Sequence, residues 1–283
     1  MGRHERGVVL VLVLMITMVI SLISLQIALN AKEHIRRSQS LRDRADAFLQ
    51  LRTVESQLQF DLLTNNWVLL QERRGSDRSR GLNFQGVPFR MAGVSVAAQD
   101  LSGLYVLPQP GRVDERLGDL FVDVGIDSVR AESAAERLTR LQSGEEGIPL
   151  QDLGDLVAQA GLDVSDVERL RAVATVYPLS AFNPLSAPTP VLKQVYSGLD
   201  LDNLLRLRRA GQLSRSSVSK ALDSIDEEFT VFSPGPVFRL DMESTVVDSS
   251  VGREMVVRVD PYDDEPVVVW SIRRKSFLTR VSR

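Results

Sequence analysis

The chain of 283 residues contains no cysteine. Disulfides, thiolate metal sites and a cysteine nucleophile are therefore excluded. Histidine is nearly absent too, because His4 and His34 both flank a long apolar segment. The rest of the chain can therefore build neither a histidine metal cluster nor a Ser-His-Asp triad. The formal net charge of -3 lacks the basic excess typical of nucleic-acid binders. Carboxylate pairs of the kind that glycosidases use remain possible, but nothing in the sequence singles one out. We therefore assign no catalytic residue and no metal ligand, and expect a protein that is not an enzyme.

Charge is absent from Val8 to Ala31. About 20 apolar residues are enough to span a bilayer, so this stretch predicts a membrane-spanning helix over residues 8–31. Arg3 and Arg6 precede the stretch. Basic residues at this position favour an N-terminus that stays in the cytoplasm.

Helix breakers are absent as well, because neither glycine nor proline occurs between Val8 and Arg74. From Leu41 to Leu62, apolar residues recur at spacings of three and four, with charged residues between them. The pattern predicts one continuous helix over residues 8–63, roughly 80 Å long at 1.5 Å per residue. The pair Asn65–Asn66 is its expected stop.

Three fates of the N-terminal segment are considered: a signal peptide that is removed, an anchor that is kept uncut, and a cut at Gly7 that leaves the apolar helix in place. No A-x-A cleavage site follows a short apolar core, which disfavours the signal peptide. The uninterrupted helix that follows favours the cut at Gly7.

The remaining chain predicts an α+β fold. Residues 64–108 carry the first strands of a sheet domain, with turns at Gly93 and Ser102–Gly103. Residues 109–228 form an inserted helical domain, which includes two short helices about a glycine-containing turn, similar to a helix-hairpin-helix pair. Residues 229–283 return to the sheet domain as an antiparallel meander. Its strands are expected at residues 230–232, 237–247, 254–259 and 267–272.

Local patterns also predict where helices of the insertion begin and end. Asp152 is the expected N-cap of the LGDLVAQAG helix, and Gly161 is its expected stop. Ser165 and Glu168 form an S-x-x-E pattern, which predicts a capping box. Pro190 suits the first turn of a later helix.

The N-terminal pattern resembles type IV prepilins and pseudopilins, in which a short leader ends in glycine before an apolar helix. The resemblance implies that residues 1–7 are a leader, that prepilin peptidase cuts between Gly7 and Val8, and that Val8 is then N-methylated. Most members carry glutamate at the fifth mature position, and here that position is Leu12.

Further stretches resemble the general secretion pathway protein K family, the large minor pseudopilins of the type II secretion system. This family also lacks the glutamate at the fifth mature position. A D-x-x-G-x-x-N-L-N phrase is matched at Asp100, Gly103 and Leu107, whereas Val106 and Pro108 replace its asparagines. The other matches are Asn183, Ala187 and Leu192, with Leu185 in place of an asparagine, and then Ser233, Phe238, Arg239 and Leu240.

The resemblance implies a non-enzymatic subunit of the inner membrane with a single pass and a periplasmic globular part. It would cap the tip of the pseudopilus together with minor pseudopilins I and J, and take part in starting its assembly. An apolar Leu12 cannot neutralise the amine of a neighbouring subunit, and a bulky helical insertion obstructs further stacking, so both features suit a tip. Prepilin peptidase and membrane lipid are the other implied partners, and no nucleic acid is expected.

Four side chains are candidates for helix packing in the membrane or filament: Leu12, Ser21, Ser24 and Gln26. Hydroxyl side chains favour close helix contacts in lipid. The three polar residues fit a position near the lipid–water interface equally well.

Some members of the family bind calcium, so calcium is a conceivable cofactor here. The oxygen-rich candidates show no recognised loop spacing, and no ligand is assigned. They are Asp200 with Asp202, and the run Asp263, Asp264 and Glu265.

Two other functions remain open. One is an unprocessed bitopic inner-membrane protein with a periplasmic binding domain. The other is a DNA-uptake pseudopilin that uses its helix pair on DNA, for which a basic face on residues 188–220 is needed. The residues that could form this face are Lys193, Arg206, Arg208, Arg209, Arg215 and Lys220.

Overall fold

The structure of the protein is a computed structural model. It describes residues 3–64, 84–107, 116–142, 150–222, 228–247 and 249–275, without the side chains of residues 3–11 and 275. Asn65–Asn66, the predicted end of the first helix, and Pro108, which replaces an asparagine of the family phrase, lie outside the described residues.

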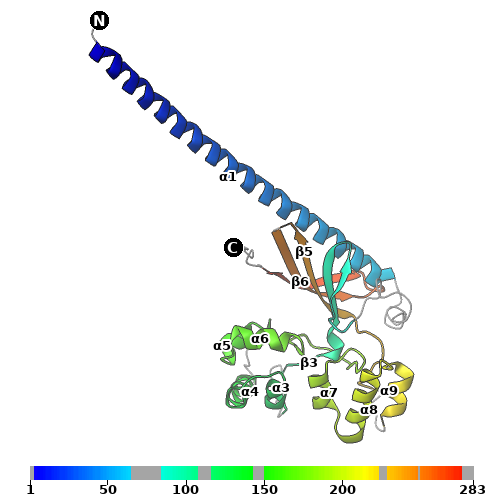
Figure 1. Cartoon of the computed structure of the whole chain (residues 1–283). Coiled ribbons are helices and arrows are strands. Elements are labelled where there is room, and N and C mark those ends of the chain that lie inside the picture. The colour runs from blue at the N-terminus through cyan, green and yellow to red at the C-terminus, as the bar shows by residue number, and fades with distance from the viewer. Residues whose placement is uncertain are drawn as a thin grey trace.

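The first element is a single helix, α1 (Arg3–Thr64), of 62 residues. Its length is about 93 Å at 1.5 Å per residue. The helix already includes Gly7, because one glycine costs a helix only about 1 kcal/mol. Figure 1 shows that the N-terminal half of α1 projects far from the rest of the molecule and that its C-terminal end lies against the sheet. The expected continuous helix is confirmed, and it begins five residues earlier than residue 8.

The sheet is antiparallel throughout and has the order β1-β2-β5-β6-β7. Its strands are β1 (Phe89–Met91), β2 (Val94–Asp100), β5 (Val237–Val246), β6 (Ser249–Val259) and β7 (Val267–Lys275). The last three strands are the predicted meander. The helical insertion follows β2 and precedes β5 in the sequence, and these two strands pair with each other in the sheet. The predicted α+β fold is therefore confirmed.

The sheet core forms between one stripe of α1 and one face of the sheet. Apolar residues of α1 at spacings of three and four are fully buried there against alternate strand residues. The helix contributes Leu51, Val54, Leu58 and Leu62, and the strands contribute Val94, Val96, Phe238, Leu240, Met255 and Val257.

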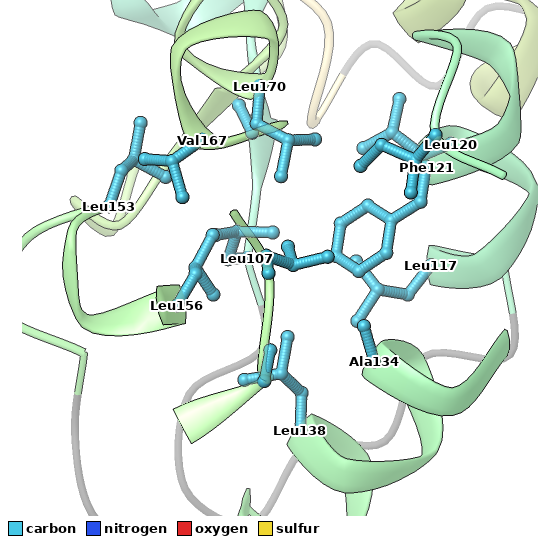
Figure 2. Packing of buried hydrophobic residues seen from close by; sticks show 14 of the residues in the cluster. Leu107, Leu117, Leu120, Phe121, Ala134, Leu138, Leu153, Leu156, Val167 and Leu170 are labelled. Carbon is cyan, nitrogen blue, oxygen red and sulfur yellow. The ribbon is translucent and has the colours of Figure 1, made fainter. Parts of the chain in front are cut away.

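The first helical cluster contains α3 (Leu117–Asp123), α4 (Ser128–Gln142), α5 (Asp155–Gln159) and α6 (Val164–Arg171). Figure 2 shows how their side chains converge on Leu107, with Phe121 near the centre. The second cluster contains α7 (Thr189–Val195), α8 (Gly198–Arg209) and α9 (Arg215–Ala221). Its buried core includes Leu192, Leu204 and Val218, one from each helix.

Short segments connect the sheet to these clusters. The 3-10 helix η2 (Leu101–Gly103) follows β2 directly. The short strands β3 (Tyr105–Val106) and β4 (Ala174–Thr175) then pair in parallel outside the main sheet. Together they bring the beginning and the end of the first helical cluster side by side.

Two predicted helix starts are wrong. The capping box at α6 is formed by Asp163 and Asp166, two residues before the predicted pair of Ser165 and Glu168. The N-cap of α5 is Gly154, and the Asp152 carboxylate instead accepts a hydrogen bond from the Gly154 N–H at 2.7 Å.

A predicted strand is also wrong. Residues 230–232 do not join the meander, because Thr230 forms only an isolated parallel bridge with Phe182. Other predicted helix boundaries are confirmed. Gly161 has φ +71° after α5, Gly211 has φ +67° after α8, and Pro190 lies in the first turn of α7.

Candidate functional site

The exposed half of α1 is the first functional feature. Within the described residues, α1 is the one helix long and apolar enough to cross a membrane. Its apolar side chains are exposed along the whole run: Leu12 is 58% exposed, Ile20 57% and Leu29 59%. A surface of this extent needs lipid or another protein chain to cover it.

The predicted site residues all lie on this half of α1. Gly7 and Val8 belong to the helical backbone, but their side chains lie outside the described residues. Leu12, Ser21, Ser24 and Gln26 are exposed. The Ser21 hydroxyl donates to the Thr17 carbonyl at 2.8 Å, so its one hydrogen-bond donor is already used within α1. The processing of Gly7 and Val8, and the packing role of the other four residues, remain predictions.

The sheet-bound half of α1 is held by polar contacts as well as by its apolar stripe. The buried Glu55 accepts a hydrogen bond from Arg253 on β6 at 2.8 Å, and Arg52 lies on its other side at 3.2 Å. Nearer to the membrane half, the Ser244 hydroxyl of β5 donates to Gln50 at 3.1 Å. These contacts fix both the rotation and the axial position of α1 on the sheet.

A second feature is a buried carboxylate where the sheet meets the helical insertion. Asp100, the last residue of β2, has no exposed surface. It accepts hydrogen bonds from the Ser102 N–H at 2.9 Å and the Ser102 hydroxyl at 2.7 Å. Three more donors come from distant segments: the Asn183 amide at 2.9 Å, the Ser186 hydroxyl at 2.8 Å and the Gly235 N–H at 3.2 Å. We call this group of side chains and N–H donors the Asp100 hub.

Asn183 extends the Asp100 hub to its neighbours. Its side-chain amide also donates to the Ser233 carbonyl at 3.1 Å, and its side-chain oxygen accepts from the Leu185 N–H at 3.0 Å. Asp100, Asn183 and Ser233 come from the three separate phrases on which the sequence resemblance rests. The structure brings them into one buried network that joins η2, the segment before α7 and the loop before β5.

Gly103 completes this junction because only a residue without a side chain fits there. A Cβ at this position would lie 2.5 Å from the Ser186 hydroxyl oxygen and 2.6 Å from the Ala187 backbone nitrogen. Atoms essentially never approach a Cβ so closely, so the backbone of η2 passes tightly against residues 186–187. Here glycine is needed for a close backbone approach.

Charged side chains make a second fastening between the first helical cluster and the sheet. Arg171 of α6 is almost fully buried and donates to Glu254 of β6 at 2.9 Å. Arg273 of β7 donates to Glu168 of α6 at 2.9 Å. The rings of Tyr177 and Trp270 pack beside these pairs with their centroids 5.3 Å apart.

This ionic cluster keeps Glu168 ionised. Partial burial of the Glu168 carboxyl tends to raise its pKa, but the hydrogen bond from Arg273 and the charge of Arg171 outweigh this effect. The pKa of Glu168 therefore lies below its ordinary value. Sequence reasoning missed this cluster, because Arg171 and Glu254 are far apart in the chain and neither belongs to a recognisable motif.

A similar balance holds at Asp166 inside the first helical cluster. Burial tends to raise the pKa of this carboxyl. The Asp163 N–H, which donates to it at 3.1 Å, and the guanidinium groups of Arg169 and Arg130 act in the opposite direction and prevail. The pKa of Asp166 therefore lies below its ordinary value.

We therefore expect Asp166→Asn to change the acid sensitivity of the protein. A carboxyl with a lowered pKa stabilises the fold above its unfolded-state pKa and loses this effect as the pH falls through the folded-state pKa. At pH 7 the variant should lose about 2 kcal/mol, as expected for hydrogen bonds to a charged group. The measurement is the urea unfolding midpoint of the full chain in detergent at several pH values. The difference between the two proteins should shrink once the pH falls below about 4, and a constant difference down to strongly acidic pH contradicts the assignment.

The oxygen-rich residues do not converge into a metal site. Within the described ranges, no group of three or more histidine or acidic side chains is placed to hold a metal ion. Asp263 accepts instead from Arg258 at 2.7 Å. Asp200 and Asp202 lie two residues apart on α8 and therefore point in different directions.

The basic residues named for a DNA-binding face are in part engaged within the protein. Lys193 pairs with Asp123 at 2.8 Å, and the Arg206 guanidinium donates to Asn203 at 2.9 Å. The Arg208 guanidinium donates to the Ala187 carbonyl. These contacts do not favour the DNA-uptake alternative.

Comparisons with known proteins find a similarity among solved structures. No protein-family model matches the chain, and no curated protein matches it. Among solved structures, the chain is similar to a chain of the GspK-GspI-GspJ complex from the type 2 secretion system of enterotoxigenic Escherichia coli. The similarity covers 85% of this chain and 100% of that chain, with 15% sequence identity and a TM-score of 0.49. At this level of similarity the match supports no functional conclusion by itself.

Proposed function

We propose that the chain is a minor pseudopilin of a bacterial type II secretion system, a non-enzymatic subunit that caps the tip of the pseudopilus and helps to start its assembly. The observation that carries the proposal is the build of α1. A short charged leader ends at Gly7, the exposed apolar half follows, and the other half packs on an antiparallel sheet without a break. A membrane anchor needs only the apolar half, whereas a filament subunit needs the whole helix to be rigidly joined to its globular part.

The proposed tip position is supported by two features of this chain. The fifth residue after Gly7 is Leu12, which carries no charge to attract the amine of a neighbouring subunit. The helical clusters lie on the side of the sheet away from the N-terminal end of α1 (Figure 1) and add bulk beyond the sheet. The proposed partners are minor pseudopilins I and J.

The proposed topology has a cytoplasmic N-terminus and a periplasmic globular part. Arg3 and Arg6 on the leader side favour it, but five lysine and arginine residues follow the apolar run between positions 32 and 44. Counting positive charges alone therefore favours the reverse orientation. The proposed cut at Gly7 supports the cytoplasmic N-terminus, because prepilin peptidases act on the cytoplasmic side.

The test is the mass of the N-terminus after expression with and without a prepilin peptidase. We expect the peptidase to remove residues 1–7 completely and to add one methyl group to the amine of Val8. Replacement of Gly7 by leucine should leave the chain at full length, and replacement of the nearby Gly2 by leucine should not prevent the cut. An unchanged mass in the presence of the active peptidase contradicts the proposal and favours the unprocessed bitopic protein.

A further inference from the structure

A short basic stretch of α1 separates the apolar run from the sheet. Between residues 32 and 44 it carries two acidic side chains, Glu33 and Asp43, among its cationic ones. The Glu33 carboxylate forms an ion pair with Arg37 at 3.0 Å. In the part of the chain that the structure describes, no ion pair to Lys32 or Arg36 is found. The cationic residues are Lys32, Arg36, Arg37, Arg42 and Arg44.

Lys32 and Arg36 lie on the face of α1 that turns towards the sheet. Lys32, Arg36 and Ser40 follow one another at spacings of four, so they share one face of the helix. The Ser40 carbonyl accepts from the hydroxyl of Ser249, at the start of β6, at 3.5 Å. The start of β6 therefore lies beside Ser40, and both cations lie between Ser40 and the end of the apolar run along α1.

The axial spacing matches one layer of lipid headgroups. Arg36 lies about 6 Å and Lys32 about 12 Å from Ser40 along α1, at 1.5 Å per residue. The headgroup region adds roughly 5–8 Å on each side of the hydrocarbon core. With the apolar run in a bilayer, the two cations are at headgroup depth and the start of β6 lies just above them.

Their like charges favour the binding of an anion between them. Like charges four residues apart on a helix repel and destabilise it. A phosphate group relieves the repulsion, and its oxygens match the fork of N–H donors on a guanidinium. Zwitterionic headgroups also carry a phosphate, but their own cation cancels its charge.

We propose that Lys32 and Arg36, with Arg37 beside them, form a binding site for the phosphate groups of anionic phospholipids. The site orients α1 in the membrane and holds the sheet at a set height above the headgroups. It depends on only one part of the proposed function, the insertion of the apolar half of α1 into a bilayer.

The test uses the full chain in phosphatidylcholine nanodiscs that contain a small fraction of spin-labelled phosphatidylglycerol or spin-labelled phosphatidylcholine. We expect phosphatidylglycerol to associate preferentially at low salt, by roughly five-fold for each cation near the surface. The double variant K32Q/R36Q should lose most of this preference, and added salt should weaken it in the unchanged chain.

The matched control is R42Q/R44Q, which removes the same charge at least about 9 Å further from the membrane along α1. It should lower the preference by less than two-fold. Equal association of the two lipids overturns the proposal, and so does an equal loss in both double variants, because the effect then comes from net charge alone. Displacement of the lipid by inorganic phosphate at matched ionic strength overturns it in favour of a site for free anions.

Two further measurements distinguish a failure of the lipid site from a failure of the proposed function. If K32Q/R36Q does not fold, the salt dependence of the unchanged chain decides, and a preference that salt does not weaken counts against the site. Alkaline carbonate extraction from membranes reports on insertion itself. A chain that is extracted contradicts the proposed function, whereas an inserted chain without lipid preference contradicts only the lipid site.

Discussion

Asp100→Ala should destabilise the protein by about 4 kcal/mol, which is a large effect for one substitution. The reason is the number of donors left behind. The Ser102 N–H and hydroxyl, the Asn183 amide, the Ser186 hydroxyl and the Gly235 N–H all point at this carboxylate inside the protein. Each buried donor without an acceptor costs about 1–3 kcal/mol, and local rearrangement recovers part of the sum.

Urea unfolding of the full chain in detergent, followed by tryptophan fluorescence, measures this loss. Trp270 is a suitable reporter because it packs on Tyr177 at the junction between the sheet and the first helical cluster. Asp100→Asn keeps one acceptor oxygen and should cost about half as much. The exposed Asp202 is the matched control, and its replacement by alanine should change stability by less than about 0.5 kcal/mol. A loss below about 1 kcal/mol for Asp100→Ala would show that the Asp100 hub does not hold the two parts together.

Gly103→Ala should be the second severe substitution, with a loss of about 3 kcal/mol from overpacking. The added Cβ meets backbone atoms of Ser186 and Ala187 at 2.6 Å, and backbone cannot swing aside as the end of a long side chain can. Either η2 or the segment before α7 has to move, and both movements lengthen the hydrogen bonds of the Asp100 hub.

Gly118→Ala is the matched control for this clash. At Gly118 in α3 the nearest atom to an added Cβ is the Cβ of Ala135 at 3.8 Å, which is an ordinary contact. Alanine is also the better helix former by up to about 1 kcal/mol, so this variant should be as stable as the unchanged protein or slightly more so. Equal melting temperatures for the two glycine variants would contradict the close approach at Gly103. The combined variant D100A/G103A should lose less than the sum of the single losses, because both act on the same junction.

Periodic features were predictable from the sequence because each element carries its own pattern. The length of α1 follows from the run without glycine or proline that ends beyond Leu62. Likewise, β5 and β6 follow from their alternation, and Gly161 and Gly211 mark helix ends through their left-handed conformation. These signals are local, so no knowledge of the partner elements is needed to read them.

The start of α6 shows where local signals compete. Residues 163–168 contain both D-x-x-D and S-x-x-E, two residues apart, and either can form a capping box. Arg130 of α4 pairs with both Asp163 and Asp166, and thereby favours the earlier start. Since Arg130 is distant in the sequence, the choice depends on tertiary contact and could not be made from the pattern alone.

The Asp100 hub was only half predictable. Asp100, Gly103 and Asn183 were recognised as parts of family phrases, but nothing in the phrases says that they meet. The meeting requires that the helical insertion fold back on β2, and that the parallel pairing of β3 and β4 bring its two ends together. Two-residue strands such as these have no periodicity to detect, because alternation needs about four residues to become visible.

The absence of a hinge in α1 has a mechanical consequence. Sharp bends in helices almost always occur at proline, at glycine or at an inserted extra residue. Neither proline nor glycine occurs from Val8 to Thr64. The two halves of α1 therefore move together as one rigid helix. If the membrane half is drawn outward by one residue step, the sheet is carried about 1.5 Å with it, and if it turns by one step the sheet turns by about 100°. Pull and torque applied in the bilayer thus reach the far side of the molecule through one stiff helix, and the Asp100 hub shares the load at the junction with the ion pairs of Arg171 and Arg273.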